Sequence, residues 1–213
     1  MNPMKTDHLS VIHIIDEYES LRKGLKFIIN NSTSNTAPYH NLNHMLTVTR
    51  HIYNALDYMF MLEDERVEEL LLAALFHDYN HSMGKQTDDI NVQEAKKGLR
   101  AFLEQEKLDM DIDFMESILD ATEYPYKLHF RRLNFYQKLI RDCDLCQAYE
   151  YNWMQQCVFG LSQEMKIPFK DLLVGQRKFL QSITFLTDYG IYVEHLYFKK
   201  MMIEFKILED IME

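Results

Sequence analysis

Glycine and proline are scarce in this chain, with six Gly and four Pro among 213 residues. This scarcity argues against a turn-rich β-architecture. Long apolar runs are also missing: the longest, residues 70–76, is far too short to span a bilayer, and the first residues, MNPMKTD, lack the apolar core of a signal peptide. The only cysteines are Cys143, Cys146 and Cys157, an odd number that favours a reducing compartment over a disulfide framework. We therefore expect a cytoplasmic protein that does not associate with membranes.

Positive charge is also limited, because 23 Lys and Arg stand against 33 Asp and Glu, for a formal net charge of −10. A protein that grips a long stretch of nucleic acid needs a basic stripe, so we expect no such partner. A single nucleotide or a small phosphoester remains compatible with this charge if a bound cation supplies the local positive field. The oligomeric state has no signature in the sequence.

The chain is rich in hydrophobic residues, and these recur with the period of a helix. Hydrophobic residues make up 47% of it, including 13 Phe, 13 Tyr and 13 Met, and no segment shows the alternation of a strand. We predict an all-α fold in which one domain, residues 1–213, forms a compact bundle of about nine helices. The predicted helices cover residues 7–30, 40–59, 64–76, 88–105, 111–122, 131–150 and 151–165, a helix that starts at 168, and 188–213 with an interruption or kink near Gly190.

Four places on this helical frame hold residues that apolar packing does not need. They are Tyr39-His40-Asn41-x-x-His44, His77-Asp78-x-x-His81, Asp144 within RDCDLCQ, and the pair Thr122-Glu123. On a helix His40 and His44, four residues apart, would share one face. Imidazole and carboxylate ligands together suit zinc, manganese or iron, and a carboxylate can bridge to a second, harder ion. Each motif alone is weak, and it is their order and spacing that carries weight.

That order resembles the HD superfamily of metal-dependent phosphohydrolases, whose signature is a His, then His-Asp, then a distant Asp. The strings YHNLNH, AALFHDYNH, ILDATEY and CDL are further similar to the catalytic domain of 3′,5′-cyclic nucleotide phosphodiesterases. The chain departs from that domain in being shorter, in the residues after His81, and in having Glu123 where the family has Asp. The departure at Glu123 puts a water-relay role at that position in doubt.

The resemblance implies an active site with one tightly held metal ion, Zn, Mn or Fe. Its ligands would be His44, His77, Asp78 and Asp144. Asp78 would bridge to a second ion, Mg or Mn. His40 would be the general acid that protonates the leaving oxygen, and His81 would help place the attacking hydroxide. A histidine suits proton donation because its unperturbed pKa is about 6.5.

A later string, Gln176-x-x-Phe179-Leu180, is similar to the Q-x-x-F-I with which the phosphodiesterases hold a purine. By this resemblance Gln176 would bind the base through its amide and Phe179 would stack on it. The alternative is an ordinary amphipathic helix in which Phe179 packs in the core and Gln176 is solvated.

The remaining candidates are read as structural. His51 is expected to support the site rather than bind metal, Cys143 and Cys146 to be ordinary helix residues, and Arg131-Arg132 to be a surface pair. Histidines without a partner at ligand spacing are His8, His13, His129 and His195. The sequence thus favours a hydrolase of a nucleotide or related phosphoester. It leaves open a sensor that binds a nucleotide or metal without turnover, and an oxygenase on the same frame, which usually needs more histidines between the His-Asp pair and the last Asp.

Overall fold

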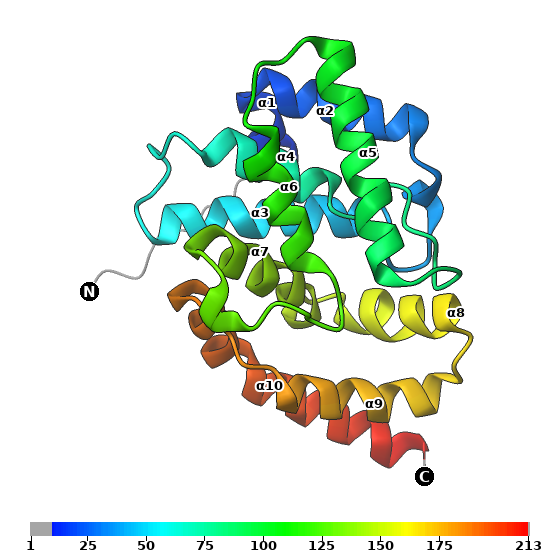
Figure 1. Cartoon of the computed structure of the whole chain (residues 1–213). Coiled ribbons are helices and arrows are strands. Elements are labelled where there is room, and N and C mark those ends of the chain that lie inside the picture. The colour runs from blue at the N-terminus through cyan, green and yellow to red at the C-terminus, as the bar shows by residue number, and fades with distance from the viewer. Residues whose placement is uncertain (1–9, 213) are drawn as a thin grey trace.

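The computed structural model describes residues 10–212, which form ten α-helices joined by short turns and loops (Figure 1). Within these residues there is no β-strand, so the predicted all-α class is confirmed. The α-helices are α1 (Val11–Glu17), α2 (Glu19–Asn31), α3 (Leu42–Tyr58), α4 (Val67–Phe76), α5 (Asp88–Glu106), α6 (Ile112–Thr122), α7 (Phe135–Leu145), α8 (Leu161–Met165), α9 (Phe169–Ser182) and α10 (Asp188–Met212). Shorter helical turns are η1 (Thr33–Thr36), η2 (Phe130–Arg132), η3 (Cys146–Tyr149) and the π-helical η4 (Met154–Gly160).

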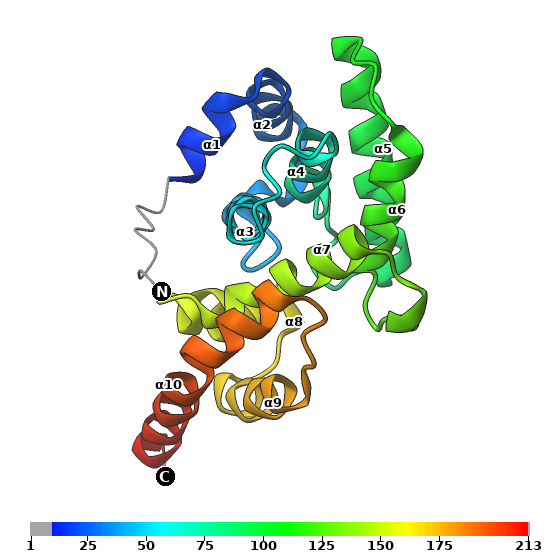
Figure 2. The same ribbon diagram turned by 90° about the vertical axis from the view of Figure 1, so that its left-hand side faces the viewer.

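Helix α4 lies at the centre, in contact with α2, α3, α5 and α6 (Figure 2). All of its residues except Glu68 and Glu69 are buried, as expected for a helix that is apolar on every side. Because α4 ends at Phe76, the next two residues, His77 and Asp78, emerge inside the molecule, where both are buried.

Helix α3 begins at Leu42, two residues after the predicted start at His40. The Asn41 side chain accepts a hydrogen bond from the His44 backbone N–H at 3.0 Å, so Asn41 is the N-cap and His40 precedes the helix. The expectation that the two histidines share a helical face is therefore wrong. Their rings are nevertheless neighbours, with centroids 6.0 Å apart, because the chain turns at the cap.

Two predicted helices are divided. The 7–30 helix breaks at Tyr18, whose extended backbone (φ −117°, ψ 122°) lets α1 pack on α3 and α2 on α4; its predicted start at residue 7 lies outside the described residues. The 131–150 helix is replaced by η2, α7 and η3. A capping box fixes the start of α7, since the Asn134 side chain accepts from the Gln137 backbone while the Gln137 side chain accepts from the Asn134 backbone.

The C-terminal third also differs from the prediction. The 151–165 helix opens with the wider turns of η4 before α8 begins, and α10 continues through Gly190 without the predicted interruption. A Cβ atom at Gly190 would lie 2.5 Å from Asp142 Oδ2, so this glycine serves close packing rather than a helix break. The predicted last residue, Glu213, lies outside the described part of the chain.

One cluster of buried apolar side chains runs through the bundle from Ile14 in α1 to Phe205 in α10. No helix within residues 10–212 is both long and apolar enough to cross a membrane.

Candidate metal centre

The four predicted ligands, His44, His77, Asp78 and Asp144, converge where α3, α4 and α7 meet. The Nε2 atoms of His44 and His77 are 3.2 Å apart. Asp78 Oδ2 lies 3.4 Å from the first and 3.2 Å from the second, and Asp144 Oδ1 lies 2.9 Å and 3.7 Å from them. Both imidazoles are buried, whereas 24% of the Asp144 side chain is exposed, on the side of a cavity.

Each imidazole is oriented by a carbonyl oxygen behind it. His44 Nδ1 donates to the side-chain oxygen of Gln147 at 2.8 Å, and His77 Nδ1 donates to the backbone oxygen of Ala74 at 2.7 Å. With hydrogen on Nδ1, the neutral ring carries its lone pair on Nε2. Two nitrogen lone pairs and two carboxylate oxygens therefore face one another, and Asp78 Oδ2 has no hydrogen-bond donor within residues 10–212.

The electrostatics of this cluster call for positive charge. Burial lowers the pKa of His77, but Asp78 and Asp144 outweigh it and raise that pKa to about 9. Burial likewise raises the pKa of Asp78, yet the nearby imidazoles of His77 and His40 bring it well below its usual range. A divalent cation among these acceptors would offset their negative charge. The ligand atoms of His44, His77 and Asp144 lie within 4.8 Å of one another and could hold one, and Asp78 Oδ2 adjoins both imidazoles at 3.4 Å and 3.2 Å. Imidazole and carboxylate donors together suit a transition metal.

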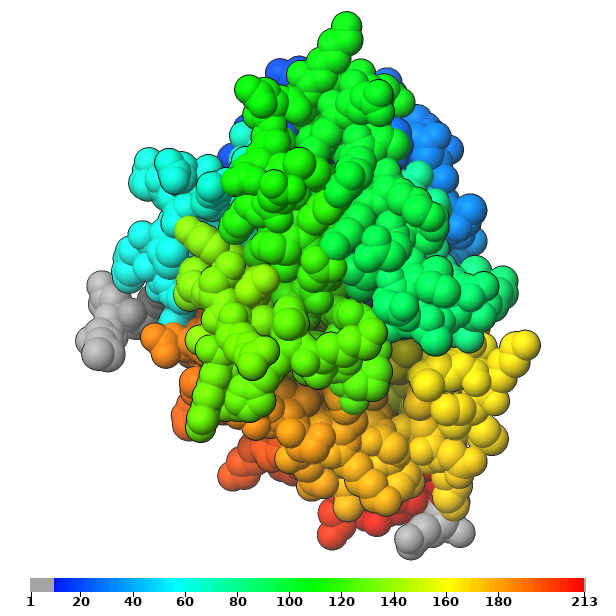
Figure 3. Space-filling view, viewed as in Figure 1, coloured from blue at the N-terminus to red at the C-terminus, as the bar shows by residue number. Residues whose placement is uncertain are grey.

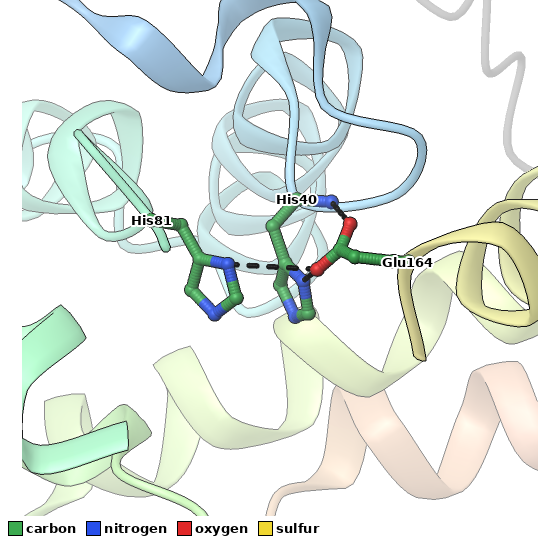
Figure 4. A group of neighbouring side chains, drawn as sticks. All are labelled: His40, His81 and Glu164. Atoms are coloured by element: carbon green, nitrogen blue, oxygen red, sulfur yellow. Dashed lines mark hydrogen bonds and ion pairs between the residues drawn. The ribbon is translucent and has the colours of Figure 1, made fainter. Parts of the chain in front are cut away.

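Figure 4 shows a second group, His40, His81 and Glu164. It lies beside the first, since the His40 and His44 ring centroids are 6.0 Å apart. Glu164 Oε2 accepts hydrogen bonds from the backbone N–H groups of Tyr39 and His40, at 3.0 Å and 3.2 Å. Glu164 Oε1 accepts from His40 Nδ1 and lies 3.6 Å from His81 Nδ1. The two imidazole rings stack with centroids 3.7 Å apart.

These contacts define the protonation of the group. Burial raises the pKa of Glu164, but the hydrogen bonds from His40 and the two amides lower it overall, so the carboxylate is ionised. His40 therefore holds a hydrogen on Nδ1, and its Nε2 points away from Glu164 (Figure 4). His81 Nδ1 accepts from the Met83 backbone N–H at 3.2 Å. Burial lowers the pKa of His81, whereas Asp88, whose Oδ1 lies 3.8 Å from His81 Nε2, helps to raise it overall.

No sequence pattern singles out Glu164, which is 124 residues from His40 and lies in an ordinary SQEMK string. The close approach of Gly160 to Pro38 brings it there, because a Cβ atom at Gly160 would lie 2.7 Å from the Pro38 oxygen. Gln147 was also missed. A signal for it existed, since it follows Asp144 by three residues and so lies about one helical turn further on.

The two groups border a cavity of about 450 Å³ that lies between the α5–α6 side of the molecule and the α8–α9 side, whose surfaces meet on the face shown in Figure 3. Gln176 and Phe179 both line this cavity, with Gln176 buried and Phe179 half-buried. The Phe179 ring makes an edge-to-face contact with Tyr124, at a centroid distance of 6.1 Å and an interplanar angle of 88°. Phe179 is thus not enclosed among core side chains, and it lines the same cavity as His77, Asp78 and Asp144.

Apart from its histidines, the described side chains of this cavity that carry charge at neutral pH are carboxylates. Among the described residues no Lys or Arg lines it. Its four carboxylates belong to Asp78, Asp88, Asp144 and Glu164. Of the pair noted in the sequence, Thr122 lines the cavity, whereas Glu123 forms an ion pair with Lys127. Any anion that enters must therefore find its positive partner in a bound cation or in protonated histidine.

The other candidates lie elsewhere. His51 is outside both groups, with Nδ1 2.9 Å from the Tyr189 hydroxyl and Nε2 2.8 Å from Glu150 Oε1. Cys143 and Cys146 are buried free thiols. His13, His195, Arg131 and Arg132 are exposed, His129 caps η2, and His8 lies outside the described residues. Comparisons of the chain with protein-family models, with curated proteins and with solved structures found no match.

Proposed function

We propose that this chain is a metal-dependent phosphohydrolase of the HD superfamily type, which cleaves a phosphodiester in a nucleotide or a related small molecule. The observation that carries the proposal is the convergence of four acceptor atoms, from His44, His77, Asp78 and Asp144, at the edge of a cavity. Buried acceptors that face one another at 2.9–3.7 Å repel unless a cation or protons lie between them.

The proposed cofactor is Zn, Mn or Fe held by these four residues. Asp78, whose Oδ1 is not used in the cluster contacts, could bridge to a second ion such as Mg or Mn. When bound, a divalent cation would make water a nucleophile near neutral pH and neutralise the phosphoryl oxygens. His81, beside Asp78 and hydrogen-bonded at Nδ1 by Met83, would orient the attacking water through its Nε2–H.

His40 is the proposed general acid. Glu164 fixes its Nδ1–H, and Nε2, on the other side of the ring, is left to donate a proton to the leaving oxygen. The Glu164 carboxylate stays with His40 because two backbone amides hold it as well. Glu164 is thus a positioning residue, and its negative charge offsets the positive charge of the protonated ring.

The charge of the cavity favours a diester over a monoester. A phosphomonoester carries about −1.5 to −2 at pH 7, whereas a diester carries one negative charge. With four carboxylates and no Lys or Arg along the wall, a less charged phosphate meets less repulsion. Gln176 and Phe179, at the same cavity, could bind a nucleobase through an amide hydrogen bond and ring stacking, the latter worth about 1–3 kcal/mol.

The test is a substrate screen on purified protein loaded in turn with Zn, Mn, Fe or Mg. Substrates would be bis(p-nitrophenyl) phosphate, p-nitrophenyl phosphate, 3′,5′-cyclic AMP and GMP, and a cyclic dinucleotide. We expect metal-dependent hydrolysis, faster with diesters than with the monoester, that is lost in Asp144→Ala and retained in Asp113→Ala, a change at an exposed position. A metal-loaded protein that binds a cyclic nucleotide without hydrolysing any substrate would instead be a sensor, and the proposal would be wrong.

A further inference from the structure

A second cavity, of about 360 Å³, is separate from the metal centre and shares no lining residue with the first. It lies between the C-terminal half of α3, the segment from η3 to Trp153, and the first part of α10. Its volume falls in the range of about 300–1,000 Å³ that is typical of small-molecule sites. Nothing in the proposed hydrolase chemistry uses it.

Aromatic rings form much of its wall. Tyr58 and Tyr192 stack with centroids 4.8 Å apart and an interplanar angle of 23°, and Tyr189 meets Tyr58 nearly edge-on at 6.0 Å. At the other end, Trp153 is buried against Phe205, with centroids 4.5 Å apart. Flat, rigid rings around a cavity suit a flat ligand, because stacking on them costs little conformational entropy.

Two polar groups on this wall, the Asn54 amide and the buried Tyr149 hydroxyl, have no hydrogen-bond partner within residues 10–212. Asn54, half-buried on α3 between His51 and Tyr58, lines the cavity, and its amide makes no hydrogen bond to any residue within 10–212. By contrast, Glu150 Oε1 accepts from Arg50 at 2.7 Å and lies 2.8 Å from His51 Nε2. The Asn54 amide offers one acceptor and two donors, the set that pairs with the edge of a heteroaromatic base.

The charges of the wall are unfavourable for an anion. Arg50 pairs with Glu150, and Lys200 lies 3.6 Å from Glu204. Asp57, exposed at the rim, makes no ion pair within the described chain, so the balance of these five groups is negative. With a net charge of −10 on the chain as a whole, a phosphorylated ligand would meet repulsion here.

We infer that this cavity binds an uncharged planar heteroaromatic molecule of the class of nucleobases and nucleosides. The tyrosine rings would stack on its face, and the Asn54 amide would bind its edge. The inference is independent of the proposed hydrolase, because no residue of the metal centre takes part.

The probe is labelled adenosine, with binding measured by equilibrium dialysis and located by fluorescence. Trp153 is the only tryptophan of the chain and lines this cavity but not the other, so its emission reports on binding here. We expect saturable binding that shifts the Trp153 emission, and binding of adenosine 5′-monophosphate that is several-fold weaker. Tyr192→Leu should weaken adenosine binding by roughly fivefold or more, the lower end of a lost stacking contact. Asn54→Leu, which keeps the tyrosine pair intact, should weaken it by roughly three- to tenfold.

Phe159→Ala is the matched control, because it removes an exposed ring, stacked on Phe169, that lines neither cavity. Its affinity for adenosine should equal that of the unaltered protein, and circular dichroism would establish that all variants remain helical. No bound adenosine at millimolar concentration would overturn the inference. So would wild-type affinity in both Asn54→Leu and Tyr192→Leu, or a loss of binding in Phe179→Ala, which would place adenosine at the metal centre. Equal affinity for the nucleoside and its monophosphate would contradict an uncharged ligand.

Discussion

The Nε2 atoms of His44 and His77 face each other at 3.2 Å, and each ring is held in that orientation by a carbonyl oxygen on its far side. Neither Nε2 can donate to the other while both rings are neutral with their hydrogen on Nδ1. The two Nε2 lone pairs repel each other unless a proton or a metal ion lies between the rings. The orientation of these two rings thus requires a proton or a metal ion, and the carboxylates of Asp78 and Asp144 favour the doubly charged ion.

We predict that the purified protein carries close to one transition-metal ion per chain. Asp144→Ala removes an anionic ligand and should lose most of this metal while remaining helical. Elemental analysis would measure the metal, with Asp113→Ala, an exposed change, as the control. Chelation should lower the melting temperature of the native protein, since a ligand that binds only the folded state stabilises it. Full metal occupancy in Asp144→Ala would contradict the assigned centre.

The rate lost when the proposed acid, His40, is removed should depend on the leaving group of the substrate. His40→Ala should slow hydrolysis of a poor leaving group by roughly 10²–10⁴-fold, the usual contribution of a positioned acid. The loss should shrink for p-nitrophenolate, which needs little protonation. Glu164→Gln, which keeps the shape but not the charge behind His40, should give a smaller loss with the same dependence. Equal losses for good and poor leaving groups would argue that His40 does not donate the proton.

Gly160→Ala should disturb the contact between His40 and Glu164. The added Cβ would lie 2.7 Å from the Pro38 oxygen, so α8 must move away and Glu164 with it. We expect a destabilisation of about 1–3 kcal/mol, typical of overpacking, and slower turnover of poor leaving groups. Chemical denaturation and kinetics would measure both. Gly175→Ala is the control for stability, because a Cβ there meets no atom within 4 Å and the helix should gain about 0.4–1 kcal/mol.

The nucleotide pocket predicts a substrate-dependent effect of Phe179→Ala. The Michaelis constant for a nucleotide substrate should rise roughly tenfold or more, because stacking contributes about 1–3 kcal/mol per base. A small aryl phosphodiester that does not reach Phe179 should be affected much less. Phe159→Ala, which removes an exposed ring stacked on Phe169 outside the cavity, should change neither constant. A uniform loss across all substrates would assign Phe179 a purely structural role.

Low pH should lower the free energy of unfolding, because Glu150 becomes protonated. Burial raises the pKa of Glu150, but His51 and Arg50 lower it to about 2 in the folded state, below its usual 4.5. The stabilisation is therefore fully present above about pH 5 and is lost as the pH falls toward 2. Glu150→Gln should lower the free energy of unfolding at pH 7 by about 3 kcal/mol and flatten its dependence on pH in this window. Urea denaturation at several pH values would measure this, with the exposed Glu65→Gln as the control; an unchanged slope in Glu150→Gln would contradict it.

Much of the fold was predictable because helical period and capping are local. The buried run at 70–76, for example, predicted the central position of α4. The break at Tyr18 was not predictable, since neither Gly nor Pro marks it and tertiary packing of α1 and α2 decides it. Gly190 was misread for the same reason, because its role is set by Asp142, 48 residues away, and not by its own helix.

In the candidate centre too, residues in local motifs could be predicted, whereas residues placed by tertiary packing could not. The four metal-cluster residues belong to recognisable local strings, and the structure brings them together. Their roles as ligands, and those of His40, His81, Gln176 and Phe179, stay predictions. Glu164 could not be found from sequence, because a lone glutamate on a short helix has the pattern of a solvated residue. Only the packing of α8 against Pro38 shows that it faces His40.

The chain order of these residues has a consequence for synthesis on the ribosome. Every member of the metal cluster lies between His44 and Asp144, whereas Glu164, Gln176 and Phe179 follow in the last third of the chain. A growing polypeptide thus contains all four residues of the candidate metal centre before it contains Glu164, which orients His40. On the ribosome, all four proposed ligands are therefore synthesised before the helices that carry Glu164, Gln176 and Phe179.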